Sequence, residues 1–274
     1  MQSYQQYPQI LFEENDDDSM KAVRIIKWVS RHISYDPNKS GMLLSTEKMC
    51  MQTFCTRQAV CDGYATLTTA WMQKAGLEAK HISGLANIIY PKRDGKTNIR
   101  HGWVVIKLNG RWWAVDPTWL SVSRVKFDGT NSKNCLFIPL KYSLYNRFPD
   151  SKEWRTSNPN LDKWAFKKSP FIGFTFWYLE PKVFPKLFTK GGKQYLQLPR
   201  LPSGKKYKYW GTDASDKHVS TQLFPIAFKD AKKLVISLEK INPDFIYLNV
   251  AIAWGRPGDF PHPGRRMLMF RVKD

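Results

Sequence analysis

Arg57-Gln-Ala-Val-Cys61-Asp-Gly-Tyr-Ala65 places a single thiol at the predicted start of a helix. Two later segments, His101-Gly-Trp103 and Val115-Asp116-Pro-Thr-Trp119, supply an imidazole and then a carboxylate. A cysteine is a useful nucleophile only as the thiolate, and a neighbouring histidine or a helix N-terminus can lower its pKa enough. The three segments together therefore predict an enzyme with a cysteine nucleophile.

The helix that we expect to begin at Val60 or Cys61 has an apolar face. Apolar side chains recur at three- and four-residue steps from Tyr64 to Ala75, and Gly76 stands where a glycine often ends a helix. The unpaired N–H groups and the dipole of its first turn would favour a thiolate. The same N–H groups can stabilise an oxyanion during acyl transfer.

A β-hairpin is predicted around Asn109-Gly110, a dipeptide that favours a type I′ turn. If these two residues form the whole loop, the register puts Asp116 opposite Trp103. Side chains two residues apart on a strand share a face, so His101 and Asp116 project from the same side. Their Cβ atoms would be about 7–8 Å apart, a gap that an imidazole and a carboxylate can bridge.

These positions suggest three roles. Cys61 would be the nucleophile, His101 would accept its proton and later protonate the leaving amine, and Asp116 would orient the ring. Taken singly, each residue has a more common structural explanation: an inert buried thiol, a packed histidine, an Asp-Pro turn. Their order and shared hairpin face favour catalysis, although spacing alone does not bring Cys61 to the hairpin. The neighbouring residues that we expect to contact substrate are Gly63, Tyr64, Trp103 and Trp119.

The rest of the chain predicts an α+β fold in two domains, residues 1–160 and 161–274. An amphipathic helix from Ser19 to His32 and a strand at Lys80–Tyr90 precede the hairpin. The Pro-, Asn- and Lys-rich segment from Arg147 to Pro170 predicts a connection between domains. Short β-type runs follow, punctuated by Gly and Pro, as in an all-β, immunoglobulin-like sandwich. These runs are Phe171–Leu179, Gln194–Leu198, Lys206–Trp210, Gln222–Phe228, Lys233–Leu238, Phe245–Ala253 and Arg266–Val272.

Composition excludes several classes of protein. The 274 residues are 42% hydrophobic and 14% aromatic, which suits packed cores rather than disorder. No apolar run approaches the ~20 residues of a membrane span. Four cysteines are too few for a disulfide scaffold, although Cys50 and Cys55 could pair in an exported protein. No close Cys or His pair indicates zinc, so we expect no metal and no cofactor.

Charge and the N-terminus bear on partners and location. The 43 basic and 23 acidic residues give a net charge of +20, which attracts anionic polymers or surfaces but also serves solubility. No nucleic-acid-binding signature directs that charge. We expect a peptide or protein substrate, with cell-wall material among the candidates. The N-terminus lacks the basic and apolar regions of a signal peptide, and the location that we favour is secreted or periplasmic, with such a signal removed.

The motifs resemble those of the transglutaminase-like superfamily, which includes bacterial cysteine-protease-like members and the kyphoscoliosis peptidase group. The family's basic residue followed by Gly-Val-Cys-x-Gly-Tyr-Ala is similar to residues 57–65. Its Ala-Gly and Ser-Gly pairs match Ala75-Gly76 and Ser83-Gly84. Its His-Ala-Trp and Trp-Tyr-x-Val-Asp-Pro-Thr-Trp blocks match residues 101–103 and 112–119.

This resemblance covers roughly residues 17–155. It implies a papain-like α+β core, in which a helix-borne Cys61 packs on an antiparallel sheet, His101 is the base and Asp116 orients it. Ala59 stands where the family often has glycine, and Val104 stands where asparagine often follows His-x-Trp. These departures concern substrate contacts more than the three reacting groups. For a second oxyanion donor, the nearby side chains to consider are Gln52 and Gln58.

Three functions remain open at this point, the third being nucleic-acid binding through charge alone, without sequence preference. The first is cysteine-dependent acyl transfer on amide bonds, with hydrolysis of a peptide or related amide ahead of transamidation; both pass through the same thioester. The second is a catalytically inactive transglutaminase-like protein that holds an anionic or glycan-containing polymer. Basic residues and the eleven tryptophans of the chain would serve that second role.

Overall fold

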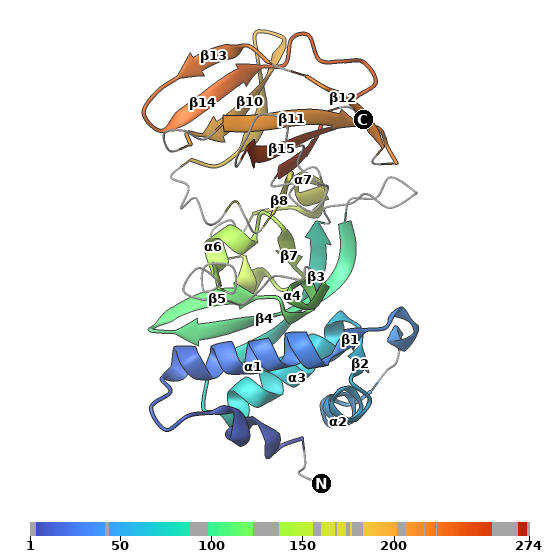
Figure 1. Cartoon of the computed structure of the whole chain (residues 1–274), viewed down its shortest axis with the longest axis vertical. Coiled ribbons are helices and arrows are strands. Elements are labelled where there is room, and N and C mark those ends of the chain that lie inside the picture. Colours follow the sequence, from blue (N-terminus) through green and yellow to red (C-terminus); the bar gives the residue numbers. More distant parts are fainter. Residues whose placement is uncertain are drawn as a thin grey trace. The chain divides into compact units, whose positions relative to one another are not determined.

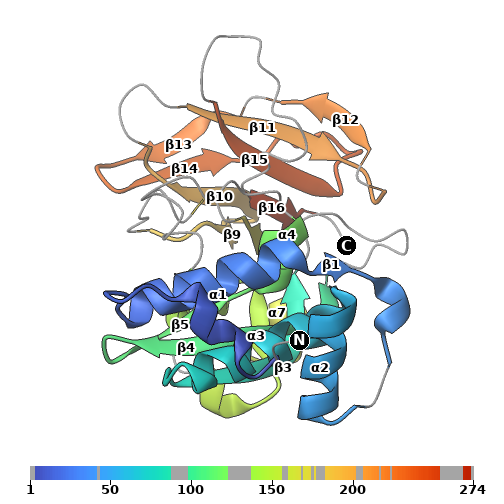
Figure 2. The ribbon, with the colours of Figure 1, turned by 60° about the horizontal axis from the view of Figure 1, so that its bottom comes forward.

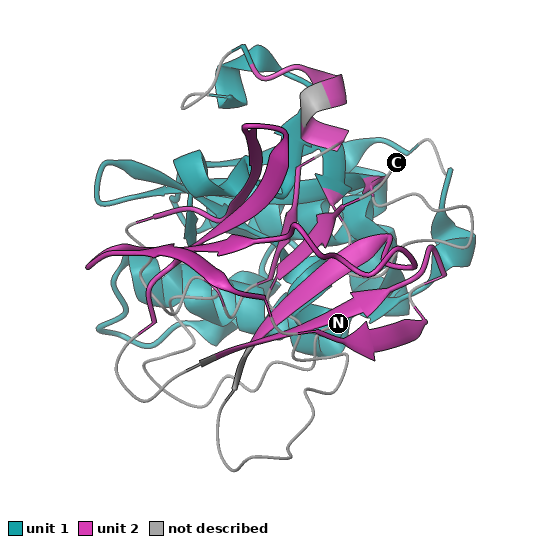
Figure 3. Ribbon diagram, turned by 90° about the horizontal axis from the view of Figure 1, so that it is seen from above, with its two compact units in different colours: residues 1–86, 100–160 teal, residues 87–99, 161–274 magenta. Residues whose placement is uncertain are grey.

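The computed structural model shows an α+β chain that divides into two compact units (Figures 1 and 3). The first unit comprises Met1–Ala86 with Arg100–Asn160, and the second comprises Asn87–Ile99 with Leu161–Asp274. Each unit is described by itself below. The structure describes residues 4–41, 44–87, 98–122, 137–155, 160–167, 169–173, 176, 183–201, 206–215, 217–222, 224–253 and 268–272.

Three long helices open the first unit. The predicted helix from Ser19 to His32 is confirmed as α1, which the Asp17 side chain caps by accepting a hydrogen bond from Met20 N at 2.7 Å. The helix predicted to begin at Val60 or Cys61 is confirmed as α3. The helices and 3₁₀ turns of this unit are η1 (Tyr7–Leu11), α1 (Asp18–His32), η2 (Pro37–Lys39), α2 (Thr46–Thr56), α3 (Cys61–Lys74), α4 (Pro117–Val122), α6 (Leu140–Ser143) and η4 (Lys152–Trp154).

The main sheet of the first unit has the strand order β6-β5-β4-β3-β7. Its β4–β5 hairpin has the predicted register, from Leu108 opposite Arg111 to Val104 opposite Val115. Asn109 and Gly110 both have positive φ, at 51° and 73°, as a type I′ turn requires. The strands are β3 (Ala79–Asn87), β4 (Asn98–Leu108), β5 (Arg111–Val115), β6 (Ile138–Pro139) and β7 (Arg147–Pro149), with a separate parallel pair β1 (Ser34–Tyr35) and β2 (Gln58–Ala59).

Side chains of β4 point alternately to the two faces of this sheet and contribute to a hydrophobic core on each face. Val104 and Ile106 pack with the apolar faces of α1 and α3, while Trp103 and Val105 pack with Leu140 on the other side. Figures 1 and 2 show α1 and α3 side by side next to β4 and β5. The strand predicted at Lys80–Tyr90 is confirmed over residues 80–87; its last three residues lie outside the described part.

The predicted connection from Arg147 to Pro170 is wrong at its beginning. Arg147–Pro149 form β7, which pairs with β3 through Ala86 opposite Arg147 and Gly84 opposite Pro149. A three-residue strand at the edge of a sheet leaves no periodic signal, and the surrounding Pro, Asn and Lys residues favour a loop.

The second unit contains two antiparallel sheets, which confirms the predicted all-β region. Their strand orders are β13-β14-β10-β9 and β12-β11-β15-β16-β8. Tyr207 Oη, from one sheet, donates to Pro199 O of the other at 2.6 Å. The elements are α7 (Lys163–Lys167), β8 (Phe171–Ile172), β9 (Lys186–Lys190), β10 (Lys193–Pro199), β11 (Lys206–Thr212), β12 (His218–Thr221), β13 (Ile226–Lys229), β14 (Lys233–Ser237), β15 (Tyr247–Ala253) and β16 (Leu268–Arg271).

Two of these strands, β9 and β12, were not predicted. Both lie at the edge of a sheet, where short strands with charged side chains are common. Parts of three predicted runs, at residues 174–175 and 177–179, at 223 and at 266–267, lie outside the described residues. Across the described part of the chain, no helix has the length and apolar character needed to cross a bilayer.

Candidate active site

Cys61 is the first residue of α3 and follows a sharp change of chain direction. Arg57 ends α2 in a left-handed conformation, with φ at 57°, and β2 then pairs with β1 before α3 begins. The Arg57 guanidinium carbon lies 4.4 Å from the ring centroid of Trp28 and 4.2 Å from that of Phe54. These cation–π contacts hold the turn that precedes the thiol against α1 and α2. The basic residue of the motif thus has a structural role.

The other described cysteines are unsuited to nucleophilic chemistry or lie away from the predicted site. Cys50 is buried, and burial, together with the negative charge of Glu47, raises the pKa of its thiol to about 11. Cys55 is exposed on the same helix, and both are free thiols, so the disulfide considered for them is not formed. Cys61 is half-buried.

His101 and Asp116 meet as the hairpin register predicts. His101 Nε2 lies 2.7 Å from Asp116 Oδ2, and both side chains are buried. The second carboxylate oxygen, Oδ1, accepts a hydrogen bond from Trp119 N at 3.0 Å, from the first turn of α4. The His101 ring stacks on that of Trp119 with 5.0 Å between centroids. Asp116 is therefore fixed at both oxygens, and it fixes the ring in turn.

The Cys61 sulfur is near enough to the His101 ring to help raise the pKa of that ring. Because Nε2 is engaged with Asp116, Nδ1 is the ring nitrogen that remains to face the sulfur. The thiol, imidazole and carboxylate thus follow one another in the order that a nucleophile, a base and an orienting acid require.

Arg147 is a fourth charged group in this cluster, and sequence reasoning missed it. Its side chain is 1% exposed, and its Nη2 donates to Asp116 Oδ2 at 2.7 Å. Its guanidinium carbon also lies 4.7 Å from the ring centroid of Trp119. The position of Arg147 on β7 follows from pairing with β3, which no local pattern in the sequence indicates.

Electrostatics keep both members of the imidazole–carboxylate pair charged. Burial disfavours a charged His101, but the carboxylate of Asp116 and the hydrogen bond to Cys61 outweigh it and raise the pKa of the ring to about 9. Burial likewise opposes ionisation of Asp116, yet His101 and Arg147 hold its pKa well below the usual range. At neutral pH the ring is an imidazolium and Asp116 is a carboxylate with two cationic neighbours.

The residues predicted to contact substrate lie in two different surroundings. Tyr64 and Trp103 are fully buried, and Tyr64 Oη donates to the carbonyl of Ile33 at 2.5 Å. These two side chains therefore expose no surface that a substrate could contact directly. Trp119 is half-buried against His101, and Gly63 lines a small cavity beside the first turn of α3.

That cavity has a volume of about 40 Å³. Water needs ~10–15 Å³ on this measure, so the space suits a short side chain or a few waters. Gly63 is needed for its shape: a Cβ there would lie 2.6 Å from Ala59 Cβ and 2.7 Å from Thr53 Oγ1. The residues that line the cavity are Lys39, Gly41, Leu44, Met49, Gln52, Thr53, Gln58, Ala59, Val60, Asp62 and Gly63. Both glutamines considered as oxyanion donors are among them.

No group of three or more His, Cys, Asp or Glu side chains that could hold a metal ion occurs among the described residues. The described residues of this site supply a thiol, an imidazole, a carboxylate and a guanidinium. Such a set suits proton transfer and covalent catalysis.

Comparison with known proteins identifies the family of this core. Residues 5–117 match the family model described as "Transglutaminase-like superfamily". Kyphoscoliosis peptidase of Mus musculus is 24% identical over 168 residues, which cover 59% of this chain and 25% of the relative. The protein of the same name from Homo sapiens is 26% identical over 162 residues, covering 54% and 23%. We therefore assign the segment that carries Cys61 to the transglutaminase-like superfamily, whose members include cysteine peptidases and transglutaminases.

The match to these relatives is partial. The chain spans about a quarter of the length of the curated relatives that it matches. Among solved structures, a proposed cysteine protease from Cytophaga hutchinsonii is 22% identical with a TM-score of 0.35, and the alignment covers 42% of this chain and 37% of that one.

The buried contact between Arg147 and Asp116 gives a first prediction. Replacing Arg147 by Met removes one of two cations from a buried carboxylate, so we expect the free energy of unfolding to fall by about 3–5 kcal/mol. Arg100→Met is the matched control, because Arg100 forms an exposed pair with Asp150 at 2.7 Å and should cost less than about 1 kcal/mol. Urea denaturation measures both values. Equal losses in the two variants would contradict the importance assigned to Arg147.

The raised pKa of His101 gives a second prediction, on stability against pH. The folded value of about 9 lies above the ~6.5 of an unfolded histidine. The ring therefore contributes stability that is fully present below about pH 6.5 and is lost as pH rises through 9. Each pKa unit between the folded and unfolded values corresponds to about 1.4 kcal/mol, so this contribution is of the order of 3 kcal/mol. Wild type should lose more of its unfolding free energy between pH 6 and pH 9.5 than His101→Gln does; parallel curves would refute this origin of the pH dependence.

Proposed function

We propose that this chain catalyses acyl transfer from an amide bond to water, through a thioester on Cys61, with peptides or related amides as substrates. The observation that carries the proposal is the buried His101 ring, which Asp116 holds at 2.7 Å and whose pKa the neighbouring Cys61 also raises.

In the first half of the proposed reaction, the Cys61 sulfur attacks the amide carbonyl carbon as a thiolate. A positive imidazolium beside the sulfur favours that charged form. The carbon–sulfur bond forms, the carbon–nitrogen bond breaks, and His101 gives its proton to the leaving amine. N–H groups of the first turn of α3 supply donors for the oxyanion. The products of this half are the thioester and a free amine.

In the second half, neutral His101 takes a proton from water as the water oxygen attacks the thioester carbon. The carbon–sulfur bond breaks, the acid is released, and the pair of thiolate and imidazolium is restored. A primary amine in place of water would give transamidation from the same thioester. Asp116 keeps the ring oriented and its charged form stable throughout.

The substrate would lie across the first turn of α3, beside the cavity lined by Gly63. A cavity of about 40 Å³ is too small for an aromatic side chain, so we expect a short side chain next to the amide that reacts. A peptide or protein remains the expected partner, with cell-wall peptides among the candidates. The alternative function, polymer binding by an inactive core, draws its support from the net charge of +20.

The experiment is turnover of a peptide amide library by wild type and Cys61→Ala, with intact-mass detection of covalent adducts. We expect Cys61→Ala to lose about 10³-fold or more of the activity while remaining folded. An acyl adduct should form on wild type and be absent from Cys61→Ala. Cys55→Ala, at an exposed thiol of α2, is the control and should retain activity.

Two results would contradict the proposal. One is turnover by Cys61→Ala at the rate of wild type. The other is the absence of any adduct or turnover together with equal binding of an anionic polymer by both proteins, which would favour the binding function.

A further inference from the structure

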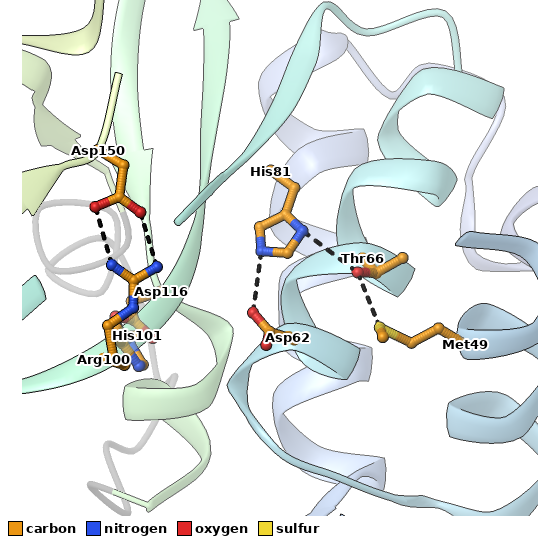
Figure 4. A network of polar contacts seen from close by, with 8 residues as sticks. All are labelled: Met49, Asp62, Thr66, His81, Arg100, His101, Asp116 and Asp150. Atoms are coloured by element: carbon orange, nitrogen blue, oxygen red, sulfur yellow. Dashed lines mark hydrogen bonds and ion pairs between the residues drawn. The ribbon is translucent and has the colours of Figure 1, made fainter. Parts of the chain in front are cut away.

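A second carboxylate–imidazole pair lies beside the triad and has no part in the mechanism above. Asp62 directly follows the nucleophile, and its Oδ1 lies 3.5 Å from Nε2 of His81 on β3. Figure 4 shows the two side chains pointing toward one another between α3 and the sheet. The Asp62 side chain is 52% exposed and that of His81 is 27% exposed, so the pair lies at the rim of the site rather than in the core.

The pair rests directly on the backbone of Gly102. A Cβ atom at Gly102 would lie 2.6 Å from Asp62 Oδ1 and 2.8 Å from His81 Nε2, distances that real Cβ contacts do not show. Gly102 is the residue after His101, as Asp62 is the residue after Cys61. A side chain at this position would therefore have to displace the ends of the Asp62 and His81 side chains, whereas Asp62 Cα, at 3.6 Å, would be in ordinary contact with it.

His81 is held from its other side by the helices. Its Nδ1 lies 3.4 Å from Thr66 Oγ1 on α3, and that hydroxyl donates to Met49 Sδ on α2 at 3.3 Å (Figure 4). The ring thus links β3 with both α2 and α3. A ring held in this way has a fixed orientation toward Asp62.

The surroundings of Asp62 favour its charged form. The contact with His81, with the positive charges of His101 and Arg100 adding to it, lowers the pKa of its carboxyl group. Asp62 is thus a second carboxylate within electrostatic range of the His101 ring. Its contact with His81 and its attraction to His101 both favour a position of the first turn of α3 close to the sheet.

We propose that Asp62, His81 and Gly102 form a positioning contact that seats the first turn of α3 on β4 and so aligns the Cys61 sulfur with the His101 ring. This inference rests on the proposed function of Cys61 and His101. Three separate elements supply the contact, and each member is next to a reacting residue or fixed by a neighbouring helix. Small errors of alignment are costly in catalysis, because a misplacement of about 1 Å can reduce rates by about 100-fold.

A double-mutant cycle on Gly102→Ala and Asp62→Ala tests the contact. Gly102→Ala alone should displace the Asp62–His81 pair and lower kcat by about 10- to 100-fold, with a much smaller change in KM. In the Asp62→Ala background the His81 ring can move into the vacated space, so the same substitution should cost less than about threefold. Such non-additivity is the signature of a direct contact. Additive effects of the two substitutions on kcat would overturn the proposal.

A readout without substrate separates this proposal from the proposed function. The rate of Cys61 alkylation by iodoacetamide at pH 7, resolved by mass spectrometry, reports the sulfur and its neighbours alone. The same non-additive pattern in this rate supports the positioning contact even if no amide is turned over. Turnover with additive alkylation rates would reject the contact and leave the proposed function standing.

Two variants at the exposed carboxylate keep the test decisive if Gly102→Ala does not fold. Asp62→Ala should slow alkylation of Cys61 by about tenfold, because the first turn of α3 loses its ionic contact with His81. Asp62→Asn retains the shape and a hydrogen bond, and it should recover a large part of that loss. Wild-type alkylation rates in Asp62→Ala, with an unchanged melting temperature, would overturn the proposal.

Discussion

The site depends on one buried carboxylate that is shared by two cations. Ionised Asp116 is removed from water, which is unfavourable unless the charge is paired and hydrogen-bonded. His101 and Arg147 both reach Oδ2 at 2.7 Å, and Trp119 N satisfies Oδ1. The residues that complete this arrangement come from β4, from β7 and from α4. The reacting ring is therefore fixed by the same charges that hold three elements together.

Cys61, the proposed nucleophile, reaches this cluster from a different part of the chain. Arg57 turns the backbone at the end of α2, and Cys61, which is half-buried, then begins α3. The contacts around Gly102 place this first turn on β4. Sulfur and ring are thus aligned by packing between a helix and a strand, and not by the covalent chain between them.

The sequence allowed prediction of those features whose geometry is local. Asn109-Gly110 fixes a two-residue turn, the turn fixes the register of the hairpin, and the register brings His101 to Asp116. The start of α3 at Cys61 follows from its apolar face and its glycine signal. These steps need only the two-residue repeat of a strand, the geometry of one turn and the periodicity of one helix.

Features that depend on distant pairing were not predictable in this way. Arg147 lies 31 residues after Asp116, on a three-residue strand whose sequence resembles a loop. The Asp62–His81 contact depends on how β3 lies against α3, which no spacing indicates. Tyr64 and Trp103 were expected at the substrate, but their side chains are fully buried. In this chain these two motif residues belong to the packing around the site.

The most direct test of the account is the pH dependence of thiol alkylation, measured for Cys61 and Cys55 in the same sample. Cys55 is exposed on α2 and serves as the internal reference. If the Cys61 sulfur is paired with an imidazolium, the ratio of its labelling rate to that of Cys55 should rise steadily as pH falls from about 9 to about 6. A constant ratio over this range would contradict the convergence of sulfur, ring and carboxylate on which the account is built.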